Sequence, residues 1–218
     1  MTPGPERRPT LTVDTVVSAA VTIADESGLD RLTMRGLSAA LGVEAASLYH
    51  HVRGKDELLA AMVDAVFAEV GPPAGDDWRA AMRARCQRLR AALMHHPWAV
   101  GVLESGTTPG PAALRHHDAV VGCLTGGGLP MAVVGRAYVL LDSYVYGFVI
   151  QERALPADGA AQTEEVARAM LEALPADTYP HLAAFTAGYV LRPGFHIGSE
   201  FEVGLDMLLD GVARSDGS

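Results

Sequence analysis

Helical periodicity is the feature that most restricts the fold of this chain. Apolar side chains recur every three or four positions, in segments that end at glycine or proline. No run alternates apolar and polar residues in the manner of a half-buried strand. Ala, Leu and Val supply most of the apolar residues, and aromatic residues are only 6% of the chain, which also favours helices over sheets. The sequence therefore predicts an all-α protein.

Stop signals divide the predicted helices into two groups, with the boundary at Gly71-Pro72-Pro73-Ala74-Gly75. Thr12 and Thr33 are the expected N-caps of the first two helices, and Ser199 with Glu202 predicts a capping box at the start of the last. The expected helices cover about residues 12–28, 33–42, 44–50, 55–70, 78–96, 98–105, 111–124, 130–154, 163–174, 179–191 and 199–212. The expected domains are a flexible tail (1–11), a three-helix domain (12–54), a connecting helix (55–70) and a larger helical domain (76–214).

The turn between the second and third helices carries the first functional signal. Gly42 can adopt the left-handed conformation that a tight turn needs, and Ser38 is small where two helix backbones must approach closely. Apolar residues on both sides can pack the two helices together: Leu37, Leu41, Val43 and Leu48. The spacing indicates a helix-turn-helix, whose second helix enters the DNA major groove. A helical hairpin without a DNA-binding role fits the turn alone as well.

The residues around the turn decide between these interpretations. Residues 32–59, LTMRGLSAALGVEAASLYHHVRGKDELL, closely resemble the DNA-binding signature of the TetR family of bacterial repressors. Residues 180–182 and 201–211 look like the C-terminal signature of its tetracycline-repressor-like branch, and residues 106–109 and 144–149 also fit that branch. The resemblance implies a homodimer that binds a palindromic operator and is released by a small organic effector. It also implies an N-terminal helix-turn-helix domain followed by a larger ligand-binding and dimerisation domain.

The resemblance implies a set of DNA-binding residues whose chemistry suits the role. Ser47 can bond to a base edge, and alanine methyl groups can contact thymine methyl groups. Lys55 is the only lysine in the chain, and it opens the fourth helix, so that its ammonium group and the helix N-terminus would both face a phosphate. The implied DNA contacts are Arg35, Ala45, Ala46, Ser47, Tyr49, His51 and Lys55.

The resemblance also places an effector cavity among the core helices. Its expected apolar and aromatic walls are Met62, Phe67, Trp98, Leu103, Tyr138, Tyr144 and Phe148, and its expected polar anchors are Glu104, Arg115, His116, His117 and Glu152. This composition suits a mostly apolar, aromatic organic ligand. Glu104 occupies the position of a metal-binding histidine in the tetracycline repressor, so we do not expect tetracycline as the effector.

The resemblance places the dimer interface on the helices over 130–154 and 199–212. These helices are expected to form a four-helix bundle with the same two helices of a second copy. Both helices are rich in apolar residues. The candidate interface or core residues are Val133, Ala137, Leu141, Leu205, Leu208 and Leu209.

Net charge and sequence motifs argue against non-specific nucleic-acid binding, membrane insertion and a metal site. The net charge of −9 argues against binding nucleic acid by bulk charge and leaves room only for a local basic surface. Two isolated cysteines, a polar N-terminus and interrupted apolar segments indicate a cytoplasmic protein that is not inserted in a membrane. Adjacent histidines on a helix point about 100° apart, so the three His-His pairs predict no metal site, and no cofactor is expected.

Catalysis has no recognisable motif in this sequence, so we do not expect an enzyme. Two alternatives remain open at this point. One is a helical small-molecule-binding protein or enzyme that does not bind DNA. The other is a transcriptional activator of the same family.

Overall fold

The computed structural model describes residues 11–106, 108–155, 160–173 and 177–215. Within these ranges the chain forms helices joined by turns and contains no strand, which confirms the all-α prediction. A short 3₁₀ turn follows the first helix at Leu29–Arg31. The helices are α1 (Val13–Ser27), α2 (Met34–Leu41), α3 (Ala45–Leu48), α4 (Lys55–Val70), α5 (Trp78–His95), α6 (Ala99–Glu104), α7 (Pro111–Gly126), α8 (Met131–Ala154), α9 (Ala160–Ala173), α10 (Pro180–Phe185) and α11 (Ile197–Arg214).

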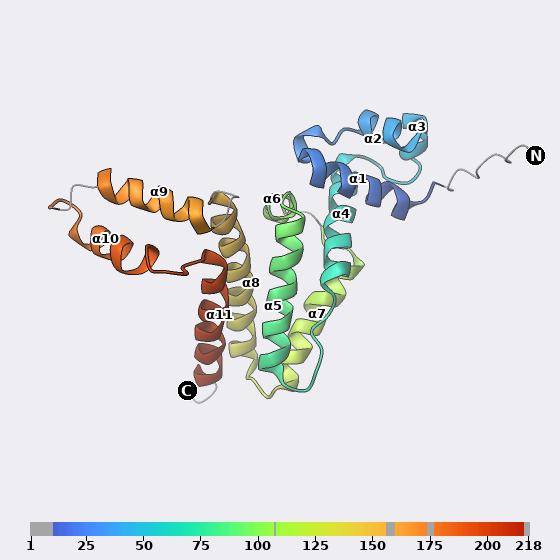
Figure 1. The fold of residues 1–218 in the computed structure, drawn as a ribbon. Coiled ribbons are helices and arrows are strands. Elements are labelled where there is room, and N and C mark those ends of the chain that lie inside the picture. The colour runs from blue at the N-terminus through green and yellow to red at the C-terminus, as the bar shows by residue number, and fades with distance from the viewer. Residues whose placement is uncertain (1–10, 107, 156–159, 174–176, 216–218) are drawn as a thin grey trace, which may run out of the picture.

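The helices form a small N-terminal unit and a larger helical body (Figure 1). Helices α1 to α3 gather at one end of the molecule, and α4 runs from them into the body, where it packs against α5 and α7. Helix α8 packs against α5, α7 and α11. Helices α9 and α10 extend as an arm away from the body. The connecting helix α4 thus belongs to both parts of the fold.

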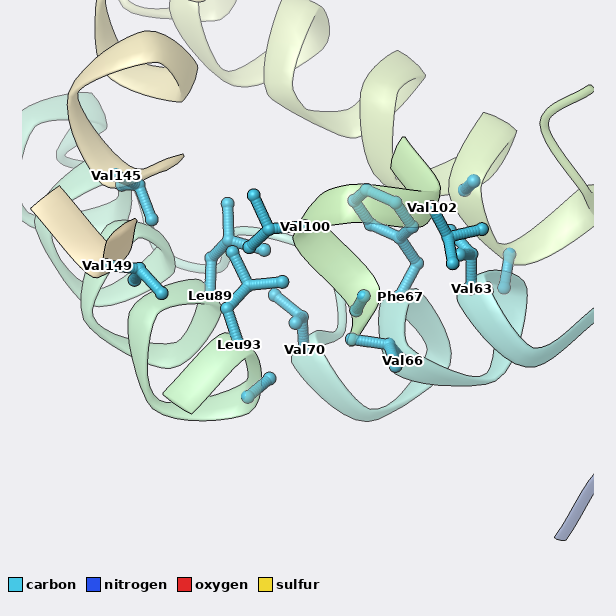
Figure 2. Close-up of a cluster of buried hydrophobic side chains, with 14 of the residues drawn as sticks. Val63, Val66, Phe67, Val70, Leu89, Leu93, Val100, Val102, Val145 and Val149 are labelled. Atoms are coloured by element: carbon cyan, nitrogen blue, oxygen red, sulfur yellow. The ribbon is translucent and has the colours of Figure 1, made fainter. Parts of the chain in front are cut away.

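A continuous buried core joins the two parts. Figure 2 shows α4 contributing Val66, Phe67 and Val70 beside Leu89 and Leu93 of α5. Side chains of α6 and α8 complete the same cluster: Val100, Val102, Val145 and Val149. Burying a side chain of this size stabilises the fold by roughly 1.5–3 kcal/mol. Because α4 shares this apolar cluster with α5, α6 and α8, its position depends on theirs.

Local sequence signals set the first two helix starts as expected. The hydroxyl group of Thr12 accepts a hydrogen bond from the Thr15 backbone N–H at 3.2 Å, and Thr33 caps α2 through the N–H of Gly36 at 3.0 Å. Each cap satisfies an N–H group that the helix itself cannot bond.

The predicted capping box of the last helix is wrong. Helix α11 begins at Ile197, and its N-cap is His196, whose Nδ1 accepts from the Gly198 N–H at 3.0 Å. Ser199 lies inside the helix and donates its hydroxyl hydrogen to the carbonyl of His196 at 2.7 Å. The imidazole of His196 therefore caps the helix, three residues before Ser199, the residue that we expected in this role.

Other boundaries differ in smaller ways. Helix α3 is only four residues long, and α7 continues to Gly126. The single helix expected over 179–191 is instead α10 followed by a π-helical turn at Thr186–Val190. Gly188 lies within this turn, and glycine lowers the preference for a regular α-helix.

Helix α8 is, within the described residues, long and apolar enough to span a membrane by length and composition alone. Core helices of globular proteins pass the same test. Since α8 packs against three other helices of the body, we interpret it as a core helix.

Candidate DNA-binding surface and effector core

The turn between α2 and α3 has helix-turn-helix geometry. Gly42 adopts the left-handed conformation, with φ of 66° and ψ of 33°, and the N–H of Val43 donates to the carbonyl of Ser38 at 3.0 Å. Ser38 is buried, as the close approach of the helices requires. Leu37 and Leu48 are fully buried, and α2 packs against both α1 and α3.

All the predicted DNA contacts lie on or near the surface of this unit. Arg35, Ala45, Ala46, Tyr49 and Lys55 are exposed, and Ser47 and His51 are half-buried. Lys55 is the first residue of α4, and Gly54 before it has no side chain to cap the helix. The first-turn N–H groups of α4 therefore lack a side-chain acceptor from the N-cap residue, a situation that suits a phosphate.

The polar contacts of His96 join α1 and α4 to the end of α5. Its Nδ1 lies 2.9 and 3.0 Å from the two carboxylate oxygens of Asp25 in α1, and its Nε2 lies 2.9 Å from Oε2 of Glu69 in α4. Burial alone would lower the pKa of His96, but its hydrogen bonds to Asp25 and Glu69, together with their charges, outweigh burial and raise the pKa. Trp98 also belongs to this joint, because its indole N–H donates to Asp25 at 2.7 Å.

Side chains of α5 and α7 hold the C-terminal end of α4. The guanidinium group of Arg88 donates to the carbonyls of Val70 at 2.8 Å and Pro72 at 2.9 Å. His116 of α7 donates from Nδ1 to the carbonyl of Gly71 at 2.8 Å. These bonds satisfy carbonyl groups at a helix end, so they also stabilise α4 locally.

A polar network lies beneath this end of α4. Arg85 is fully buried, donates from Nε to His116 Nε2 at 3.0 Å and forms an ion pair with Asp142 at 2.5 Å. Its Nη2 has no hydrogen-bond partner among the described residues. Burial, together with the charge of Arg85, lowers the pKa of His116 to about 4. His116 is therefore neutral at pH 7, with its proton on Nδ1.

Part of the predicted effector set comes together around this network. The ring of Phe67 lies 5.2 Å from both His116 and His117, and the hydroxyl of Tyr138 lies 2.8 Å from His117 Nδ1. A cavity of about 210 Å³ opens beside them and includes Arg115, a predicted anchor. Its lining residues are Phe67, Ala68, Gly71, Pro72, Ala112, Arg115 and His116.

The remaining predicted effector residues lie elsewhere. Tyr144 and Phe148 pack on Phe201 of α11, with ring centroids 5.3 and 5.1 Å away, and the Tyr144 hydroxyl donates to the Phe201 carbonyl at 2.9 Å. Glu152 pairs with Arg90 of α5. Four more do not line this cavity: Met62 is buried in the core of α4, Trp98 bonds to Asp25, Leu103 is half-buried, and Glu104 is the exposed last residue of α6.

Comparison with known proteins decides the family. Residues 16–62 match the family described as bacterial regulatory proteins of the tetR family, and residues 71–215 match the tetracyclin repressor-like C-terminal domain. The chain belongs to the TetR family. It is a helix-turn-helix transcriptional regulator, and its relatives are repressors rather than enzymes.

Curated relatives of this TetR family protein match it over most of their length. It is 36% identical over 215 residues to the HTH-type transcriptional repressor DrrR1 of Streptomyces coeruleorubidus, covering 94% of this chain and 78% of the relative. It is 31% identical over 205 residues to the tetracycline repressor class A from transposon 1721 of Escherichia coli, covering 92% of this chain and 90% of that protein.

Solved structures of similar fold come from Streptomyces coelicolor. ActR in complex with actinorhodin aligns with a TM-score of 0.78 at 28% identity, covering 96% of this chain and all of that one. The transcriptional regulator SCO7222 aligns with a TM-score of 0.81 at 28% identity, covering 95% of this chain and all of that one.

The structure revises the expected interface residues of this TetR family protein. Five of the six are at most 6% exposed and serve as core residues of the single chain: Val133, Ala137, Leu141, Leu205 and Leu209. Leu208 is half-buried. The same two helices expose other large apolar residues, which form what we call the outer apolar face: Val139, Leu140, Ile150, Val203 and Met207.

Sequence reasoning missed two features between the DNA-binding unit and the body. One is the joint made by Asp25, Glu69 and His96, because no motif connects residues so far apart in the chain. The other is a groove of about 840 Å³ between α1, α4 and the start of α7, lined largely by small and apolar residues. The period of the apolar residues in α1 and α4 predicted their packing but not the space left between them.

Proposed function

We propose that this protein is a ligand-responsive repressor that binds a palindromic operator as a homodimer and is released by a small organic effector. The observation that carries the proposal is the double attachment of α4. Its first residue, Lys55, follows the end of the recognition helix α3 by seven residues, and its C-terminal end is held by His116 and Arg88 in the body. A ligand that moved this end of α4 would therefore change the position of the DNA-binding unit. Action on DNA would place the protein in the cytoplasm.

The DNA-binding part of the proposal assigns roles by residue. Ala45, Ala46 and Ser47 at the start of α3 would contact base edges, and Tyr49, His51 and Lys55 would contact phosphates. Arg35 would reach a guanine edge or a phosphate. The exposure of five of these seven side chains on one small unit supports this assignment.

The homodimer part rests on the outer apolar face of α8 and α11. Val139 is 60% exposed and Met207 is 68% exposed, which is unusual for large apolar side chains gathered on neighbouring helices. Packing α8 and α11 against the same helices of a second copy would bury this face in a four-helix bundle.

The effector part places an aromatic organic molecule beside Phe67, His116 and Arg115, where the cavity of about 210 Å³ lies. The Nη2 atom of Arg85, which has no hydrogen-bond partner in the part of the chain that the structure describes, belongs to the side chain behind His116. A carbonyl or phenolate oxygen on the ligand would satisfy this donor, which otherwise remains buried without a partner at a cost of about 1–3 kcal/mol. The similar protein ActR was solved in complex with actinorhodin, which supports a small-molecule effector for this chain.

Footprinting of the full-length protein on the DNA that flanks its own gene tests the proposal. We expect protection of a palindromic site with half-sites about one helical turn apart, and loss of protection when a ligand from an aromatic compound library is added. Protection that does not depend on DNA sequence, or an operator complex that no compound releases, would contradict the proposal.

A further inference from the structure

Three side chains with metal-ligand chemistry meet where the DNA-binding unit contacts the body. They are Asp25 of α1 and the adjacent pair His95 and His96 at the end of α5. One ligand atom from each lies within 4.8 Å of the other two. The cluster lies outside the cavity beside Phe67 and outside the recognition helix.

The end of α5 explains why two adjacent histidines converge here. Neighbouring residues on a regular helix point about 100° apart, which was the reason to expect no metal site. Helix α5 ends at His95, and His96 leaves the helix with φ of −111° and ψ of 71°. The two rings are therefore close, with centroids 4.6 Å apart.

We propose that Asp25, His95 and His96 bind a divalent transition-metal ion of the zinc class. Two imidazole nitrogens and one carboxylate oxygen form a typical zinc donor set, which leaves a fourth position for water. Ligand atoms around a tetrahedral zinc ion lie about 3.4 Å apart, given bonds of about 2.1 Å. His95 is exposed, so its side chain is free to close the remaining distance. Binding of the metal at Nδ1 of His96 replaces the proton on that nitrogen.

Glu69 gives the site the outer hydrogen bond that metal-binding histidines require. Its carboxylate lies 2.9 Å from Nε2 of His96, on the side of the ring opposite to Nδ1. A histidine that ligates a metal through one nitrogen usually donates its other N–H to a carboxylate, which fixes the orientation of the ring. Trp98 orients Asp25 in the same way, through the indole N–H.

The bound ion would tie α1 to the end of α5. Asp25 lies in the DNA-binding unit, and both histidines belong to the body. The metal would thus hold the two parts in one arrangement. This consequence for DNA binding rests on the proposed function, whereas metal binding itself does not.

Titration of the full-length protein with Co²⁺, after treatment with a chelator, tests the site directly. We expect the visible absorption bands of four-coordinate Co²⁺, a stoichiometry of one ion per chain, and loss of the bands when Zn²⁺ is added. His95→Ala should weaken Co²⁺ binding by at least about 100-fold. Glu69→Gln should weaken it by about 10–100-fold, the usual effect of losing an outer partner.

Two controls separate the site from general effects. His181→Ala removes another exposed histidine, on α10, and should leave the titration unchanged. Circular dichroism should show that His95→Ala keeps the native fold, because this side chain is exposed. Absence of the Co²⁺ bands in the wild type, or equal binding by His95→Ala, would overturn the proposal and leave the cluster as a hydrogen-bonded joint. Neither result depends on operator binding, so failure of the proposed function is distinguishable.

Discussion

His116 shows how one buried side chain can connect two parts of the fold. It donates to the backbone at the end of α4 and accepts from Arg85, and only the neutral ring can do both. Burial and the charge of Arg85 keep it neutral. His117, beside it, also has a lowered pKa, chiefly through burial. At the residue scale, therefore, protonation of this pair opposes the native structure.

The lowered pKa of His116 predicts a loss of stability in acid. In the unfolded chain the pKa of His116 returns to about 6.5, so the unfolded state binds the proton first as the pH falls. The contribution of neutral His116 to the free energy of unfolding is fully present above about pH 6.5. It is lost between pH 6.5 and 4, by up to about 1.4 kcal/mol per pH unit. Urea unfolding of the wild type and of His116→Asn at pH 7, 6 and 5 checks this. The variant should be less stable at pH 7 and should have a smaller pH slope. Equal slopes would show that His116 does not control the effect.

Lys55 provides a second test at the residue scale. Lys55→Ala should weaken binding to all DNA sequences about equally, because a phosphate contact carries no base information. The slope of log affinity against log salt concentration should fall by about 0.9 for each phosphate that the protein no longer neutralises, hence by about two units in a dimer. Fluorescence anisotropy with operator DNA over a range of salt concentrations measures this. Arg168→Ala, an exposed charge on the α9 arm, should leave the slope unchanged. A changed base preference with an intact slope would refute the phosphate assignment.

At the scale of the element, α4 is the part of the fold that both proposed binding events share. Its N-terminal end belongs to the DNA-binding surface, and its C-terminal half contributes Phe67 and Val70 to the cluster in Figure 2. Asp64 also fixes it to α7, by accepting the N–H of Ala113 at 2.8 Å. A rigid helix with these attachments can transmit a displacement along its axis.

Phe67→Leu tests this coupling. A substitution between apolar side chains of similar size should cost less than about 1.5 kcal/mol of stability, so the variant should fold. Its operator affinity without ligand should stay within about threefold of the wild type, but the effector concentration for half-release should rise by about tenfold or more. Val63→Ala, a buried change on the same helix outside the cavity lining, is the matched control and should shift release less. Equal shifts for the two variants would contradict a direct role for Phe67 in ligand binding.

For the whole molecule, the outer apolar face is the surface that the proposed second copy would cover, although the core within one chain is already complete. The residues that fill the contact between α8 and α11 inside the chain are distinct from those on the outside. Exposed apolar side chains on two neighbouring helices would cost stability and solubility unless a second copy covers them.

Met207→Glu tests the dimer. A charge in the middle of a buried apolar interface is strongly unfavourable, so the variant should sediment as a monomer at micromolar concentration. Its helical content should remain, because Met207 is exposed in the single chain. Leu114→Glu introduces the same charge at a 58% exposed apolar residue of α7 and should remain dimeric. A wild-type monomer, or a dimeric Met207→Glu variant, would refute the proposed interface.

The sequence by itself determined the features that depend on nearby residues. Thr12, Thr33 and Gly42 act within three or four residues of their own position, so the first helix starts and the left-handed turn were predictable. The apolar period fixed the helical class for the same reason. At the start of α11 the local pattern predicted Ser199 as the N-cap, whereas the folded chain uses His196.

Only the tertiary structure decided which apolar and polar side chains meet. Periodicity marks Leu205 and Leu209 as apolar, but it cannot tell whether the chain itself or a second copy covers them, because that depends on where α5 and α8 lie. Tyr144 and Trp98 contact residues other than Phe67, although the residue types of all three suit an aromatic pocket, because the positions of their helices decide which side chains meet. His95 and His96 converge on Asp25 because α5 ends between them and α1 lies beside that end. No local sequence pattern contains this arrangement, since it depends on where α1 lies in the folded chain.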